Sequence, residues 1–146
     1  MPTSTRTDPY KACNFRVEID GLTTGSFSEC SGLTAEIEVI DYREGADKAL
    51  NVRKLPGLRK YSNITLKRGY TNNTELWDWY RNIVQGKADR RNGAIILLDD
   101  EHNDVMRWSI KNALIKKIEG PSLKADGNEV AIESVELAHE GLTLES

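Results

Sequence analysis

The sequence holds only two cysteines and two histidines among its 146 residues, which excludes a disulfide framework and leaves no spaced His/Cys set for zinc. Its longest apolar run, Ala94 to Leu98, is far shorter than the roughly 20 residues that a membrane-spanning helix requires, so we predict no membrane insertion. No apolar signal region precedes Cys13. We therefore expect a chain made in the reducing cytoplasm, with Cys13 and Cys30 as free thiols.

The net charge of −3 conceals a separation of charge along the chain. Between Lys48 and Thr74 there are seven basic residues and no acidic residue, whereas between Ile118 and Ser146 there are seven acidic residues and one lysine. Opposite charges on different parts of one small protein suit head-to-tail contact between identical subunits. Two solvated faces would give the same pattern, and the charge alone leaves both interpretations open.

Alternation of apolar and polar residues predicts strands along most of the chain. Phe15, Val17 and Ile19 alternate with charged residues and are followed by the turn-forming pair Asp20-Gly21. The polar residues 1–8 lack this pattern, and we expect a flexible N-terminal arm there. In the last strand the apolar residues shift from even to odd positions near Glu133-Ser134, which indicates a bulge. The same period predicts further strands over 33–42, 62–69, 106–118 and 129–137, and the apolar run 94–98 is predicted to form a hairpin with 106–118.

One segment, 72–86, has the period of an amphipathic helix. Asn72 and Glu75 have the spacing of a capping box, and Gly86 stands where a C′ glycine ends a helix. Trp77 and Trp79 flank an apolar stripe formed by Leu76, Tyr80, Ile83 and Val84. The chain is therefore expected to be mainly β, with a single domain over 9–146: an antiparallel β-barrel or sandwich with one flanking α-helix.

Between Arg43 and Arg53 the alternation of apolar and polar residues is lost, and a long polar connection takes the place of a strand. Lys54-Leu55-Pro56-Gly57 has the Pro-Gly order of a type II turn. Long connections inside compact domains are usually functional or disordered. We predict that this segment is an interaction loop.

Two patterns contain residue types that occur in metal and catalytic sites. The run Asp99 to Asp104, with His102, lacks the alternate carboxylates and central glycine of a calcium loop, so it is predicted to be an exposed turn. His139 with Cys13 or Cys30 lacks a third group that would orient the base, and we expect a histidine hydrogen-bonded at a strand end. We predict no catalytic residue, no cofactor and no metal.

The basic stretch Lys48 to Arg68, with Tyr61 and Tyr70, has the composition of a surface for single-stranded nucleic acid. Carboxylates in the other predicted strands would repel a polyanion. Contact with an acidic surface of a neighbouring subunit explains the same residues, and a monomeric enzyme or nucleic-acid-binding module is kept as the competing class.

Many segments are similar to signature segments of the tail tube proteins of contractile phages and extracellular contractile injection systems. The similarity runs from Asp8 to Leu144 without a large gap. It includes Asn14-Phe15-Arg16-Val17-Glu18-Ile19-Asp20-Gly21 and Leu76-Trp77-Asp78-Trp79-Tyr80. The other matching segments are 8–10, 27–33, 42–45, 53–61, 66–69, 90–93, 128–133 and 136–142.

This resemblance implies a tail-tube (Hcp-like) fold in a non-enzymatic structural subunit. It implies a homo-hexamer whose rings stack into an inner tube, with a channel for protein or DNA cargo. The implied partners are a contractile sheath protein, baseplate or spike proteins, cap or terminator proteins, and a tape-measure protein or cargo in the lumen. The implied location is the bacterial cytoplasm during synthesis, then a phage tail or a released injection particle. The alternative is a tube-initiator or tube-terminating paralogue that joins the tube to baseplate or cap.

In the family the rings are stacked by a long loop and the N-terminal arm, and the matching loop here is 41–61. We predict that Leu55 and Leu58 are the apolar anchors of this inter-ring contact. The full predicted set is Arg43, Arg53, Lys54, Leu55, Pro56, Leu58 and Arg59.

Overall fold

The computed structural model describes residues 8–22, 27–43, 45 and 52–145, so residues 1–7 of the predicted N-terminal arm lie outside the described part. The fold is mainly β, as predicted. The elements within that part are β1 (Phe15–Ile19), β2 (Glu29–Ser31), β3 (Ala35–Tyr42), β4 (Arg53–Tyr61), β5 (Ile64–Gly69), α1 (Glu75–Val84), β6 (Arg91–Leu98), β7 (Asp104–Glu119), β8 (Ile132–Ala138) and β9 (Gly141–Glu145).

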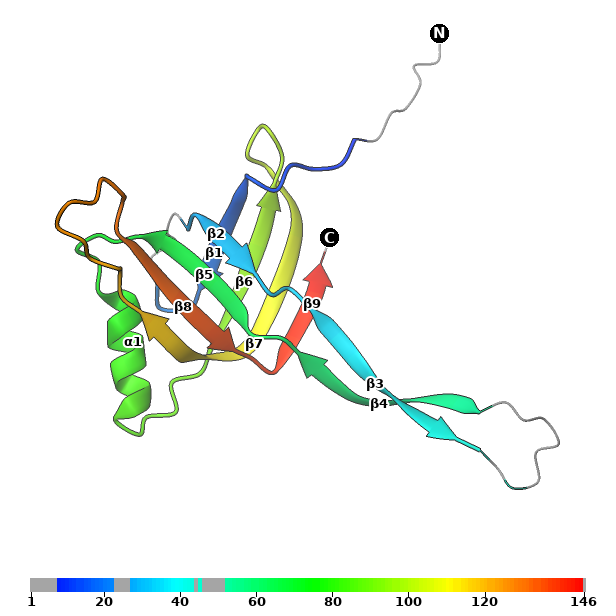
Figure 1. Cartoon of the computed structure of the whole chain (residues 1–146). Coiled ribbons are helices and arrows are strands. Elements are labelled where there is room, and N and C mark those ends of the chain that lie inside the picture. Colours follow the sequence, from blue (N-terminus) through cyan, green and yellow to red (C-terminus); the bar gives the residue numbers. More distant parts are fainter. Residues whose placement is uncertain (1–7, 23–26, 44, 46–51, 146) are drawn as a thin grey trace, which may run out of the picture.

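Seven strands form one antiparallel sheet in the order β1-β6-β7-β8-β5-β2, with β9 also paired to β7 (Figure 1). The long strand β7 belongs to two layers of the sheet. Its residues up to Ala113 pair with β6 in the first layer, and its residues from Leu114 onward pair with β8 in the second. Asn112, between these parts, has a positive φ of 51°. The sheet therefore folds back on itself into an open barrel with β1 and β2 at its two ends.

The core lies between the two layers. Val17, Ile95 and Ile110 point inward from the first layer, and Leu66 and Val135 point inward from the second. The turn predicted over Asp99 to Asp104 is confirmed, and it joins β6 to β7 as a hairpin. Among the described residues, no helix is long and apolar enough to cross a membrane.

Helix α1 covers one open side of the barrel, and Leu76 and Trp79 enter the core. Trp79 was predicted at the flank of the apolar stripe, whereas it is fully buried and Val84 is 65% exposed. The predicted cap at Asn72 is wrong as well: the N-cap is Thr74, and Asn73 Oδ1 accepts a hydrogen bond from the Glu75 amide at 2.9 Å. Gly86, with φ +87°, follows the helix end as predicted.

The predicted bulge in the last strand is absent. β8 begins at Ile132 and pairs with β5 in unbroken register from Gly69↔Ile132 to Ile64↔Leu137. The inward-facing residues of β8 are therefore Glu133, Val135 and Leu137, and the carboxylate of Glu133 accepts a hydrogen bond from Arg68 of β5 in the core. The apparent change of phase arose from treating an inward glutamate as an outward one.

The strand predicted over 33–42 is confirmed as β3, whereas residues 53–61 of the segment predicted as a long loop form strand β4. β3 and β4 form a separate two-stranded sheet that projects from the barrel, and Lys54-Leu55-Pro56-Gly57 lies inside β4 rather than at a turn (Figure 1). The register shifts between Ile37 and Val39, which accommodates one extra residue of β4 near Gly57 as a bulge. Proline is tolerated because each strand of a two-stranded ribbon has an unpaired edge.

Candidate assembly surfaces

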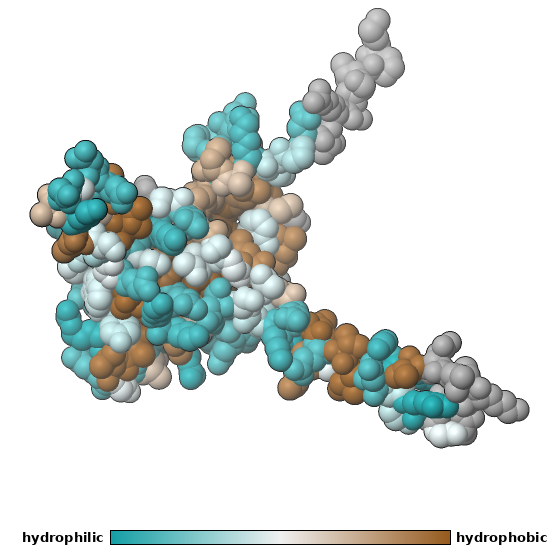
Figure 2. Space-filling view, viewed as in Figure 1, coloured by the Kyte–Doolittle hydropathy of each residue, from teal (hydrophilic) through white to brown (hydrophobic). Residues whose placement is uncertain are grey.

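The β3–β4 ribbon, here called the hairpin arm, carries large apolar side chains in solvent. Leu58 is 73% exposed and Val39 is 61% exposed. Ile40 lies opposite Leu55 in the register, so their side chains share one face of the ribbon. Brown apolar side chains cover much of the arm in Figure 2. A lone two-stranded ribbon is marginally stable in water, so this arm has the character of a surface that packs against another molecule.

All seven residues predicted for the inter-ring contact lie on or beside this arm. Arg43 follows β3 directly, and the other six belong to β4; every one is exposed. The structure therefore brings them together.

The basic residues of the arm do not form a surface of one charge. Lys54 Nζ lies 2.5 Å from Asp41 Oδ1, and Lys60 Nζ lies 2.5 Å from Glu38 Oε1, both across the two strands. The hydrogen bond from Glu38 raises the pKa of Lys60 above its usual value. These exposed pairs contribute little to stability, and their main effect is to fix the register of the ribbon.

Two contacts hold the base of the arm. The ring nitrogens of His139, in the turn between β8 and β9, lie 3.1 Å from Gly141 O and 3.0 Å from Ser62 O, and Tyr61 packs beside the imidazole ring. This confirms the prediction of a hydrogen-bonded histidine at a strand end. Gly32, with φ +92°, leads from β2 into the arm and passes so close to Asn63 that a Cβ would lie 2.1 Å from its carbonyl oxygen.

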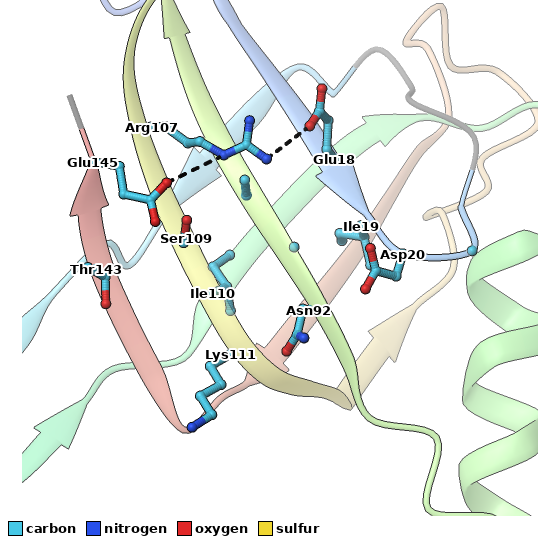
Figure 3. Close-up of a pocket in the computed structure, with 13 residues that line it drawn as sticks. Glu18, Ile19, Asp20, Asn92, Arg107, Ser109, Ile110, Lys111, Thr143 and Glu145 are labelled. Carbon is cyan, nitrogen blue, oxygen red and sulfur yellow. Dashed lines mark hydrogen bonds and ion pairs between the residues drawn. The ribbon is translucent and has the colours of Figure 1, made fainter.

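The outward face of β1, β6, β7 and β9 is polar and slightly hollowed, with a cavity of about 760 Å³ (Figure 3). We call it the charged face. Arg107 reaches across it, with Nη2 3.4 Å from Glu18 Oε2 and Nε 4.0 Å from Glu145 Oε2. Arg16 contacts Asp104 at 2.8 Å, and this hydrogen bond raises the pKa of the guanidinium. Beneath these side chains lies a small buried cluster of Ala94, Ile96 and Leu98.

The sheet under the charged face has two edges that pair with no other described strand, β1 and β9. Each neighbouring pair from β1 through β6 and β7 to β9 is antiparallel, so β1 and β9 run in opposite directions. When copies are related by rotation about an axis along the strands, β9 of one copy lies antiparallel to β1 of the next. The four strands can therefore continue from copy to copy as one closed antiparallel sheet.

The carboxylates predicted as an acidic surface after Ile118 are mostly engaged within the chain. Glu133 is buried against Arg68, Glu136 accepts a hydrogen bond from Asn63, and Glu140 accepts one from Asn112. Sequence reasoning missed both this buried pair and the charged face. The signal for that face lay in the polar positions of two alternating strands, which are Arg16 and Glu18 in the first and Arg107, Ser109 and Lys111 in the second.

The remaining candidates from the sequence have ordinary surroundings. Cys13 is exposed and Cys30 is half-buried, and both are free thiols. Burial raises the pKa of Cys30 to about 11. Asp99 Oδ1 accepts hydrogen bonds from the amides of Glu101 and Asn103, as expected for a turn. Within the described ranges no group of three or more His, Cys, Asp or Glu residues is placed to hold a metal ion.

Comparison with known proteins identifies the family of this chain. Residues 11–143 match the family model described as T4-like virus tail tube protein gp19. Among curated protein sequences, no significant match is found. Because the family match covers most of the chain, the protein belongs to this tail tube family, and it is a structural tube subunit of the kind found in contractile injection systems.

Solved structures agree over nearly the whole chain. A chain of the PVC sheath-tube complex, from an extracellular contractile injection system, is 28% identical with a TM-score of 0.83, over 94% of this chain and 92% of that chain. A chain of the anti-feeding prophage tube terminating cap is 25% identical with a TM-score of 0.87, over 99% and 96%. Hcp1 from Flavobacterium johnsoniae, 11% identical with a TM-score of 0.56 over 90% and 94%, shares the fold.

Proposed function

We propose that this chain is a main tube subunit that acts without enzymatic activity, as six copies per ring in rings that stack into a hollow inner tube. The observation that carries the stacking is the hairpin arm, a projecting ribbon with Leu55 and Leu58 in solvent. Stacking removes these side chains from water, which stabilises the assembly by roughly 25 cal/mol for each Å² of apolar surface buried. Six is the number that the family resemblance implies.

Within a ring, we propose that β9 of one copy pairs with β1 of the next. The opposite directions of the two edges permit this pairing around the whole ring. The charged face of each copy then lines the channel, and its apolar cluster stays covered by Arg16, Arg107 and their partners. Because Arg16 and Arg107 on this wall are paired with Asp104, Glu18 and Glu145, much of its charge is neutralised for a passing protein or nucleic acid.

The partners proposed for the tube are a contractile sheath on its outside, a baseplate or spike at one end and a cap or terminator at the other. The matching chains come from a PVC sheath-tube complex, an anti-feeding prophage cap and a PVC sheath/tube terminator, which supports these partner classes. The same matches favour a second candidate, a terminating paralogue at the tube end. A tape-measure protein or cargo would occupy the lumen.

The experiment is a pair of substitutions on the arm, Leu55→Asp with Arg59→Glu. We expect rings to form and tubes to be lost in negative-stain electron microscopy, because a buried carboxylate and a reversed charge would sit in the contact between rings. The matched control is Val84→Asp with Arg90→Glu, two exposed positions away from the arm, and it should leave tube length unchanged. Tubes of normal length in the arm variant would contradict the inter-ring assignment.

A further inference from the structure

The open side of the barrel between β1 and β2 forms an apolar groove. These two strands end the sheet order and do not pair with each other within the described part of the chain. The cavity there has a volume of about 370 Å³ and is lined by residues of β1, β2, β6 and β7 and of the segments beside them. We call it the seam groove, and its lining includes Ala12, Phe15, Cys30, Leu33, Leu97 and Trp108.

The seam groove is a poor site for water and a good one for apolar side chains. At roughly 30 Å³ for each water, its volume equals that of about a dozen waters, but most of its lining offers them no hydrogen-bonding partner. Phe15, Leu33 and Trp108 pack against the core with part of their surface still open. Covering this groove would extend the hydrophobic core of the barrel.

We propose that the seam groove receives the hairpin arm of a second copy of this chain. This inference rests on the proposed tube function and names the surface that the arm contacts. The arm and the groove are the complementary halves of one contact, since the arm exposes Leu58 and Ile40 and the groove is lined by apolar side chains. The arm runs away from its own barrel in Figure 1, so the groove that it fills belongs to a neighbour.

Charge on the arm and on the turn beside the groove favours the same partner. The backbone amide of Leu98 donates to Asn14 O at 2.9 Å, which places the acidic turn after β6 beside the groove residues Phe15 and Leu97. This turn bears Asp99, Asp100, Glu101 and Asp104, and Glu29 lies on the groove lining. The base of the arm lies near the middle of β7, because His139, which contacts Ser62, follows Ala138, the partner of Leu114. The arm carries four basic residues in β4 (Arg53, Lys54, Arg59 and Lys60) against three acidic residues in β3, so it has a small excess of positive charge that suits the acidic turn beside the groove.

The test is disulfide crosslinking between two versions of the full chain, both carrying Cys13→Ser. Native Cys30 remains, because a thiol with a pKa of about 11 is a poor nucleophile at neutral pH. One version carries Ala12→Cys, at the exposed rim of the groove, and the other carries Leu58→Cys, on the arm. The two are mixed, assembled and oxidised with copper phenanthroline, and dimers are counted on a non-reducing gel. As a control, Val84→Cys replaces Leu58→Cys.

We expect at least a tenfold excess of dimer in the mixture of Ala12→Cys and Leu58→Cys over the control mixture. Tubes that form normally but give no such excess would overturn the groove assignment and leave the tube function standing. Absence of both rings and tubes in the unmodified protein would overturn both. Ala12→Trp, which fills the mouth of the groove from an exposed position, should give rings with at least tenfold shorter tubes at an unchanged Tm, and tubes of full length would contradict the proposal.

Discussion

Two charged residues, Arg68 and Glu133, are buried in the second layer of the barrel. Arg68 and Glu133 face each other from paired strands, with Nε and Oε2 3.3 Å apart and side-chain exposures of 10% and 1%. Arg68 also lies over the ring of Phe27, with its guanidinium carbon 5.6 Å from the ring centroid, and Nη2 approaches Asn73 O at 3.4 Å. The pair thus joins β5 and β8 to the segment that begins α1. A buried pair of this kind is costly to break, although an apolar pair of similar volume can replace it.

We expect Glu133→Leu to lower the free energy of unfolding by about 3 kcal/mol, because it leaves the Arg68 charge buried without its partner. The double variant Arg68→Met with Glu133→Leu should recover most of that loss. Urea unfolding of both, with Glu129→Leu as an exposed control, checks the prediction. Equal losses in the single and double variants would show that packing, and not charge pairing, determines stability at this site.

A second ion pair, Arg91 with Asp89 beside α1, makes the stability of the fold depend on pH. Arg91 contacts Asp89 through two nitrogens at 2.9 and 3.1 Å, and its guanidinium carbon lies 4.9 Å from the Trp79 ring centroid. The hydrogen bonds from Arg91, more than that from Asn82, hold the pKa of Asp89 below the ordinary value of 3.8. This carboxylate therefore contributes stability that is fully present above about pH 4 and is lost as the pH falls through the lower, folded-state pKa.

The expected result for Asp89→Asn is a stability deficit that is constant from pH 5 to pH 7 and shrinks below about pH 4. The deficit should be modest, because the pair is partly solvated. Chemical unfolding at a series of pH values measures it. A deficit that grows toward acid pH would have the opposite sign and would refute the assignment.

Among the elements, strands with a clear alternation or an apolar run were predictable from sequence, and β4 was not. β1 and β5 alternate against a core, so a period of two located them, while β6 is buried on both faces and was located as an apolar run. β3 was located by its alternation although its side chains are mostly exposed, whereas Pro56-Gly57 in β4 imitates a turn. The seven contact residues predicted on the hairpin arm came from the family resemblance and from composition. Glu133 was misplaced because a charged residue that points inward is invisible to alternation.

The direction of the arm depends on the glycine that precedes it. We expect Gly32→Ala to be more destabilising than Gly86→Ala, although both glycines have positive φ, because only at Gly32 would the new Cβ meet a carbonyl oxygen, 2.1 Å away. Gly86→Ala should cost about 1 kcal/mol from backbone strain alone. Thermal unfolding compares the two. Similar losses of stability would mean that the backbone at Gly32 can move away from the Asn63 carbonyl without a cost in free energy.

At the scale of the whole molecule, the unpaired strand edges and the exposed apolar surface lie where contacts between tube subunits would need them. The free edges β1 and β9 suit ring closure, the exposed apolar arm suits stacking, and the charged face suits contact with a water-filled channel. These features follow from tertiary structure, since each combines strands that are distant in sequence. Composition alone left open whether the separated charges mediate head-to-tail contact between copies or lie on two solvated faces.

Cryo-electron microscopy of the purified full-length chain tests the central claim most directly. The account predicts a hollow tube of stacked six-membered rings, with Arg16, Glu18 and Arg107 on the channel wall and β9 of each copy hydrogen-bonded to β1 of the next. Particles that stay at the 16.4 kDa of a single chain at every concentration would contradict it. So would rings whose channel is lined by β2, β5 and β8.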